Sequence, residues 1–384
     1  MCCHKVLDKE NVLLCSSKTY PRHRVTMVFN RNLEASDRLK VSLDRTFKFL
    51  KDSRNQDGFW FDFLTLAGES VYWVSAYLGY NIICCRKVPE ERMWLERVSY
   101  SILANQGTDG GWGYGFGVPS DGDSTSWCLR FLSKLGVKSQ LSLEKANSFL
   151  LKHQSPVDGG FRTYANPSHV GRYMMLDGTV SFEGWASSQL CVTAIATKAL
   201  IETGSTEGVD KALDFIRRGQ VWEGYWNPYW WSGKLYATVN CMEALKAAGD
   251  NNANILGNAQ NWIAKTQLSD GSWSDSPQPV EGWAFSTALA LKGLMVEANL
   301  NFSEKILNCV DWLLNHQLSD GSWSSNHILR IPHPSKVDPW NQTIWKEDGK
   351  AINAAIKDHN RLFTTATVFS ALSEFENKFL KGEL

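Results

Sequence analysis

A short acidic run at the start of one predicted helix could supply a proton to a substrate. The run reads Asp121-Gly122-Asp123-Ser124-Thr125. A carboxyl among apolar groups is desolvated, which raises its pKa above the ordinary value of about 3.9, and an ionised Asp121 nearby would raise the pKa of Asp123 further. The helix N-terminus and the two hydroxyls would stabilise the conjugate base after the proton leaves. Such a carboxyl is protonated at neutral pH and is still a strong donor.

The same run also has a purely structural interpretation, because Asp and Ser are among the most frequent N-cap residues of helices. On that interpretation Asp123 caps its helix and takes no part in chemistry. An internal repeat favours the chemical role, since it aligns Asp123 with aromatic side chains. The two roles are compatible with each other.

Six copies of one turn motif divide the chain into units. In each copy a Gln is followed closely by an acidic residue, a Gly and an aromatic residue, and the steps between successive Gln residues are 50, 48, 66, 47 and 50. In an acidic residue–Gly turn the Gly supplies a positive φ. A regular period of this kind is the sequence signature of a repeat architecture. The copies begin at Gln56, Gln106, Gln154, Gln220, Gln267 and Gln317.

Each turn stands between a charged helical segment and a nearly uncharged one. An uncharged helix is buried on most sides, whereas a charged helix faces water on one side. The sequence therefore predicts an all-α fold, a single (α/α)6 barrel of six outer/inner helix pairs with Asp-Gly-aromatic turns. An open solenoid would need polar capping repeats, and none is evident. We expect the barrel over residues 37–376, an N-terminal arm over 1–36 and a C-terminal tail over 377–384.

The repeat also aligns the first turns of the inner helices. A small hydroxyl residue recurs in each of them, and the position two residues earlier holds Trp73, Asp123, Cys191, Tyr236, Phe285 and Phe363. Every turn precedes an inner helix, so these positions lie at one end of the barrel. Aromatic faces stabilise a desolvated cation by about 2 kcal/mol or more each. An acid among rings fits the protonation of an alkene, because the carbocation that forms has no counter-ion in reach.

Aromatic residues at this end are expected to contact the substrate. Two long insertions, residues 162–183 and 324–360, are predicted to form lids over it. The first contains Tyr164, His169, Arg172 and Tyr173. The predicted substrate-binding residues are Trp73, Tyr236, Phe285, Phe363, Trp185, Trp230, Trp231 and Trp283. A polar head group could meet Arg330, His333, Lys234 or Arg361, and the terminating base could be water, Asp338 or Asp358.

The repeated turns and the acidic run resemble those of triterpene and class II terpene cyclases. Pro119 to Thr125 resembles the family's Asp-x-Asp-Asp acid motif, with Ser124 in place of the last Asp. The resemblance implies that Asp123 is the general acid and that Asp121, the first Asp of the motif, is the second catalytic residue. The length fits the single-domain members of the family. Protonation of a linear polyprenyl chain, expected to be an aryl-linked (meroterpenoid) precursor, and cascade ring closure are implied, without a metal or a cofactor.

The composition limits the other functions. The 40 Lys+Arg and 40 Asp+Glu residues balance, which argues against a nucleic-acid partner. The sequence contains no run of 18 apolar residues, so it predicts no membrane-spanning helix. The nine Cys form no C-x-x-C pair, which is typical of a reduced, cytoplasmic protein. Because the predicted substrate is hydrophobic, we also expect transient contact with a membrane.

Three alternative functions share parts of this pattern. A zinc-dependent transferase resembling protein prenyltransferases would need an Asp-x-Cys ligand pair, which the cysteines do not provide. An (α/α)6 glycosidase would need two carboxylates facing the mouth. A non-catalytic isoprenoid-binding barrel would keep the aromatic cavity and tolerate the loss of the Asp123 carboxyl.

Overall fold

The computed structural model describes residues 33–85, 89–166, 170–171, 173, 180–250, 252–276, 281–297 and 299–381. Most of the predicted N-terminal arm therefore lies outside the described residues, as do His169 and Arg172 of the first insertion. Helix α2 begins at Leu33 rather than at the expected residue 37, and a π-helix, η3 (Glu376–Leu380), continues into the expected tail.

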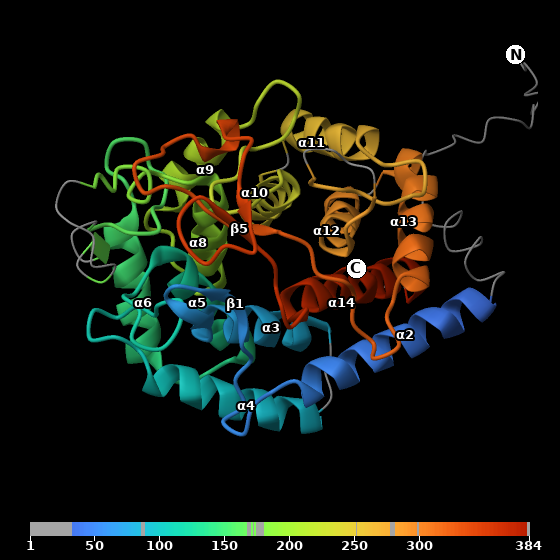
Figure 1. The fold of residues 1–384 in the computed structure, drawn as a ribbon, viewed down its shortest axis with the longest axis horizontal. Helices are drawn as coiled ribbons and strands as arrows, with labels where there is room; N and C mark the ends of the chain where they lie inside the picture. Colours follow the sequence, from blue (N-terminus) through green and yellow to red (C-terminus); the bar gives the residue numbers. More distant parts are fainter. Residues whose placement is uncertain are drawn as a thin grey trace, which may run out of the picture.

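The described residues contain twelve α-helices that alternate between an outer and an inner ring (Figure 1). Each inner helix packs against the next, and the last packs against the first, so the ring is closed. The predicted all-α fold is confirmed. The outer helices are α2 (Leu33–Asp52), α4 (Pro89–Ala104), α6 (Gln140–His153), α9 (Val209–Arg218), α11 (Ala253–Lys265) and α13 (Ser303–Asn315). The inner helices are α3 (Tyr72–Cys85), α5 (Gly122–Leu135), α8 (Leu190–Glu202), α10 (Leu235–Ala247), α12 (Ala284–Met295) and α14 (Leu362–Phe375).

The two rings differ in burial as their compositions require. The inner helix α12 buries every residue except Lys292. The outer helix α9 buries only Val209, Ala212, Leu213 and Ile216, which is the single stripe expected of a surface helix. None of the helices in the described part of the chain has the length and apolar character that a membrane crossing requires.

The repeated turns fix each inner helix to its outer partner. In every turn the backbone N–H of the aromatic residue donates to the repeated Ser or Thr hydroxyl of the inner helix, over 2.8–3.4 Å. Where the aromatic residue is Trp, its Nε1–H also donates to an outer-helix carbonyl ten residues earlier, over 2.7–2.8 Å. The turn glycines all have a positive φ, between 82° and 105°, which a side chain would strain.

The repeated Gln residues join neighbouring units. Gln106 donates from Nε2 to the Gly110 carbonyl in its own turn and to the Ser142 carbonyl of the next outer helix. Gln317 does the same across the ends of the chain, because its Nε2 lies 3.0 Å from the Ser42 carbonyl of α2. The first turn is held differently, because the Asn55 side-chain oxygen accepts the backbone N–H of Phe59.

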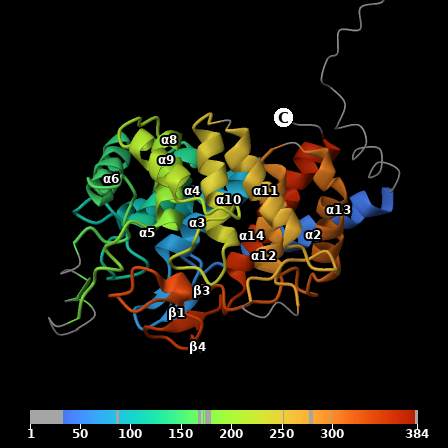
Figure 2. The same ribbon diagram turned by 90° about the horizontal axis from the view of Figure 1, so that it is seen from above.

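Short strands lie at the end of the barrel where the turns lead into the inner helices (Figure 2). Strands β1 (Asp62–Thr65) and β2 (Gly68–Ser70) form an antiparallel hairpin. The 324–360 insertion contains β3 (Leu329–Ile331), the 3-10 helix η2 (Pro339–Asn341), β4 (Lys346–Glu347) and β5 (Ala354–Ile356). In its sheet β5 pairs antiparallel with β3 and parallel with β4. A further 3-10 turn, η1 (Leu300–Phe302), precedes α13.

Hydrogen bonds attach this second insertion to three other segments of the mouth. The Arg330 N–H donates to the Trp230 carbonyl, the Gly184 N–H to the Pro334 carbonyl and the Leu66 N–H to the Lys350 carbonyl, each over 2.8 Å. The insertion predicted as a lid is therefore an ordered cover over one end of the barrel.

Candidate active site

A cavity under this cover contains both acidic residues of the Asp121–Thr125 run. Its volume is about 950 Å³, part of which is open to solvent. Its wall is formed by the β1–β2 hairpin, helices α3 and α5, the first insertion, residues 230–231 and the 324–360 insertion. The wall is mostly apolar and aromatic, which is the usual character of a site for a hydrophobic small molecule.

Asp121 is the N-cap of α5, so the capping role belongs to it and not to Asp123. Its side chain accepts the Ser124 backbone N–H over 2.7 Å. Asp121 is 3% exposed, and burial raises its pKa to about 6 against the opposing effect of the Ser124 hydrogen bonds. Ser124, which stands where the cyclase motif has a third Asp, is thus a partner of the capping residue.

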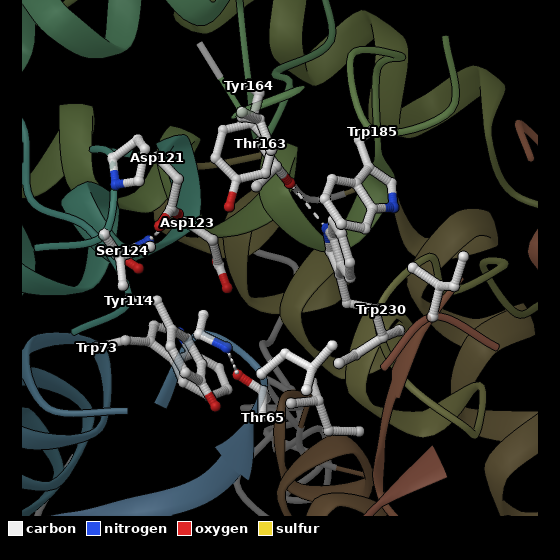
Figure 3. A pocket seen from close by; sticks show the side chains of 18 of the residues that line it. Thr65, Trp73, Tyr114, Asp121, Asp123, Ser124, Thr163, Tyr164, Trp185 and Trp230 are labelled. Carbon is white, nitrogen blue, oxygen red and sulfur yellow. Dashed lines mark hydrogen bonds between the residues drawn. The ribbon is translucent and has the colours of Figure 1, made fainter. Parts of the chain in front are cut away.

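Asp123 lies in the first turn of α5 and points into the cavity (Figure 3). Its Oδ1 atom is buried and has no hydrogen-bond partner among the described residues. Burial raises the pKa of Asp123 well above its ordinary value, and the charge of Asp121 raises it further. The Trp73 indole N–H opposes this shift slightly, although it does not reach hydrogen-bond geometry. A neutral carboxyl with a free oxygen therefore faces the ring-lined space.

Four of the eight predicted substrate-binding residues line the same cavity as Asp123: Trp73, Trp185, Trp230 and Trp231. Trp230 is fixed by its indole N–H, which lies 2.8 Å from both Thr163 Oγ1 and Gln189 Oε1. Trp185 is fixed by a bond from Nε1 to the Pro332 carbonyl of the cover. These indoles have defined positions, as cation stabilisation by ring faces requires.

Three other predicted residues lie beneath the cavity floor. Trp231 stacks on Tyr236 with ring centroids 3.7 Å apart, and it also contacts Phe285 and Phe363 at 5.4 and 5.3 Å. Trp231 thus stands between these rings and the open space. Trp283, the eighth, is the N-cap residue of α12 and is not part of the cavity wall.

Two parts of the wall were not predicted from the sequence. Tyr114 stacks on Trp73 with centroids 5.9 Å apart, and its hydroxyl donates to the Phe63 carbonyl. Thr65, Leu66 and Ala67 of the β1–β2 hairpin also line the cavity. Tyr114 follows the second turn motif directly, so its place between the turn and the inner helix was the available signal.

The four candidate contacts for a head group separate clearly. Arg330 lines the cavity, whereas His333, Lys234 and Arg361 do not. Lys234 lies over the Tyr225 ring, and Arg361 forms an ion pair with Asp320 at 2.9 Å. The two carboxylate candidates for a terminating base, Asp338 and Asp358, are also absent from the cavity wall. Within the described residues no group of three or more His, Cys, Asp and Glu side chains is placed to hold a metal ion.

Comparisons with known proteins agree with this geometry. The Squalene-hopene cyclase C-terminal domain family matches residues 187–336, and the Prenyltransferase alpha-alpha toroid domain family matches residues 19–166. The type II terpene cyclase MstE from Scytonema, in complex with its substrate geranylgeranyl dihydroxybenzoate, superposes with a TM-score of 0.82 and 28% identity over 89% of this chain and 98% of MstE. The chain has the fold of a single-domain type II terpene cyclase. A second MstE structure, which holds the product merosterolic acid A, superposes equally well.

The curated relatives are larger than this chain. Drimenyl diphosphate synthase from Streptantibioticus cattleyicolor is 28% identical over 205 residues, which cover 50% of this chain and 35% of that enzyme. Terpentedienyl-diphosphate synthase from Kitasatospora griseola is 24% identical over 205 residues, which also cover 50% of this chain and 35% of that enzyme. The matched region therefore spans about a third of the length of these relatives. The resemblance to single-domain class II terpene cyclases inferred from the sequence is confirmed by the agreement with MstE.

Proposed function

We propose that this chain is a protonation-initiated terpene cyclase with Asp123 as its general acid. The observation that carries the proposal is the Oδ1 atom of Asp123, which is buried, has no hydrogen-bond partner among the described residues and belongs to a side chain that faces an aromatic cavity. The proton on Asp123 moves to the CH carbon of the terminal alkene of a polyprenyl chain and leaves a tertiary carbocation on the carbon that carries the two methyl groups. Neighbouring alkenes attack in turn, each forming a carbon–carbon bond, and a final proton loss gives a product isomeric with the substrate.

The surroundings of Asp123 suit both sides of this proton transfer. Before transfer, burial and the charge of Asp121 favour the neutral acid. After transfer, the positive end of α5 stabilises the new carboxylate, because Asp123 lies in the first helical turn. The faces of Trp73, Trp230 and Trp231 stabilise the cation as it moves along the chain.

We propose a linear polyprenyl chain linked to an aryl group as the substrate. The similarity to MstE, whose substrate is geranylgeranyl dihydroxybenzoate, supports this class. We further propose transient contact with a membrane surface during substrate uptake. Leu66 of the cavity wall is 68% exposed and Ile344 of the cover is 83% exposed, so both are free to touch lipid. Cosedimentation with phosphatidylcholine vesicles, weakened at least threefold by Leu66→Ser with Ile344→Ser, measures this contact.

The deciding experiment incubates the purified protein with geranylgeranyl dihydroxybenzoate and follows cyclised isomers of unchanged mass by chromatography and NMR. Asp123→Asn removes the transferable proton, so we expect the rate to fall at least about 100-fold, the usual scale of general acid catalysis. Asp275→Asn is the matched control. Asp275 is also a partly buried carboxyl whose pKa is raised to about 6 by desolvation, but it accepts a hydrogen bond from the Ser286 hydroxyl and lies outside the cavity.

We expect the control variant to keep the wild-type rate within a few-fold. Turnover by Asp123→Asn at the wild-type rate would contradict the role of Asp123. Tight binding of the substrate without any cyclised product from the wild-type protein would instead indicate an isoprenoid-binding barrel.

A further inference from the structure

Arg330 is a buried cation in the wall of the cavity. It is the central residue of β3, and it is 3% exposed. Its Nε and Nη2 atoms each donate to a backbone carbonyl over 2.8 Å, those of Tyr229 and Pro228. The guanidinium also lies 5.1 Å from the centre of the Trp345 ring. These contacts hold the side chain in one position next to the open space.

No carboxylate neutralises this cation among the residues that the structure describes. The Arg330 partners are neutral carbonyls and a ring, and the groups that affect its pKa most are the Cys191 thiol and the Tyr229 hydroxyl. Burial lowers the pKa of Arg330 to about 10, so the guanidinium is still charged at neutral pH. Burying an unpaired charge is costly. A cation kept in this state beside a cavity is typical of a site that receives its anion from a ligand.

Arg330 lies on the wall opposite the proposed acid. Its backbone N–H bonds the carbonyl of Trp230, and Trp230 lies across the cavity from Asp123 (Figure 3). A guanidinium beside the first carbocation would oppose its formation by Coulomb repulsion. At the far wall it can instead hold the end of the substrate that is not protonated. Lys350, which is exposed, is a second cation among the residues that line the cavity.

We propose that Arg330 is the specificity-determining residue for an anionic head group, a carboxylate or phosphate, on the polyprenyl substrate. The head group bound there sets which alkene of the chain reaches Asp123. This inference rests on the proposed function, because it assigns the two ends of one substrate to two walls of the same cavity. Arg330 is the stronger of the two cations in this role, since a guanidinium offers paired N–H donors to the two oxygens of the anion.

The experiment measures binding without turnover, in the Asp123→Asn background. The probes are geranylgeranyl dihydroxybenzoate as the free acid, its methyl ester, and geranylgeranyl diphosphate, each followed by quenching of tryptophan fluorescence. We expect the free acid to bind at least tenfold more tightly than the ester. Arg330→Met should reduce this preference to less than threefold, whereas Lys234→Met, which removes an exposed cation outside the cavity, should leave it unchanged.

Arg330 also holds two backbone carbonyls, so a second variant is measured beside Arg330→Met. Arg330→Lys keeps the charge and should retain part of the preference. If neither variant folds, the comparison of acid with ester in the protein with Arg330 intact still decides. Equal binding of acid and ester there, or an unchanged preference in Arg330→Met, would overturn the proposal. Tighter, Arg330-dependent binding of the diphosphate would support it and identify phosphate as the head group. Cyclisation by Asp123→Asn would refute the role of Asp123 as the general acid. It would leave the role of Arg330 untouched, because the binding preference for the acid over the ester is measured separately.

Discussion

At the scale of single residues, Asp123 has an unfavourable environment for a charged carboxylate. Its Oδ1 is buried without a hydrogen-bond partner in the part of the chain that the structure describes, and Asp121 stands two positions before it. Folding therefore favours the protonated form of Asp123 far more than water does. Function and stability are opposed at this residue, as is common at active sites.

This opposition predicts how stability depends on pH. Above about pH 3.9 the unfolded chain loses the Asp123 proton, whereas the folded chain keeps it because its pKa is raised. The folded state then loses stability, relative to Asp123→Asn, by about 1.4 kcal/mol per pH unit until the folded pKa is reached. Urea unfolding of both proteins at pH 5, 6 and 7 measures this. A stability difference that stays constant over these pH values would contradict a raised pKa.

The sequence located the acid at this scale but not all of its surroundings. The repeat placed Asp123 among Trp73, Tyr236, Phe285 and Phe363, and Trp73 does line the cavity. The other three rings lie under Trp231, which is outside the repeat and comes from the segment before α10. Stacking between a loop residue and inner helices is a long-range contact, and no local spacing in the sequence reports it.

At the scale of elements, each turn depends on one hydroxyl of the inner helix. Thr287 Oγ1 accepts the buried backbone N–H of Trp273 over 3.0 Å. Thr287→Val keeps the shape but leaves that N–H unsatisfied, so we expect a loss of about 1–3 kcal/mol in the free energy of unfolding. Thr197→Val is the control, because the Thr197 hydroxyl is equally buried but bonds only the Thr193 carbonyl, which already belongs to the helix. Urea unfolding measures the two losses in the free energy of unfolding. Equal losses in Thr287→Val and Thr197→Val would contradict a specific contribution from the turn hydrogen bond.

The turns were predictable because their signals are local: a Gly with positive φ, a hydroxyl residue at fixed spacing and an aromatic residue between them. The sheet in the cover was not. Strands β3 and β5 have three residues each and pair directly with each other. The cover that contains them is held by the distant carbonyl of Trp230, which accepts from the Arg330 N–H, and by the Leu66 N–H, which donates to the Lys350 carbonyl, so its structure depends on the assembled mouth. Length and proline content indicated only that residues 324–360 form a lid.

At the scale of the whole molecule, the barrel is a ring whose first and last units must meet. Gln317 makes that contact: its Nε2 donates to the Ser42 carbonyl and Thr46 hydroxyl of α2 and to the Gly321 carbonyl of its own turn. Gln220 makes the equivalent contact inside the chain, to the Ile255 carbonyl of α11 and to Gly224. The Gln220 link therefore joins two units that are adjacent in the sequence, whereas the Gln317 link joins the last unit of the barrel to the first.

If the ring is closed, the Gln317 and Gln220 links should make similar contributions to the free energy of unfolding. Gln317→Leu removes the side-chain donor to the buried Gly321 carbonyl, and Gln220→Leu removes the donor to the buried Gly224 carbonyl, so each should lower the free energy of unfolding by about 1–3 kcal/mol. If α2 were instead a loosely attached end, Gln317→Leu would cost almost nothing, because α2 would already separate from α13 and α14 before the rest unfolds. Urea unfolding measures the two losses, and hydrogen exchange of α2 measures its separation. Fast exchange of α2 in the unmodified protein, with no further change in Gln317→Leu, would show that the ring is open at this junction.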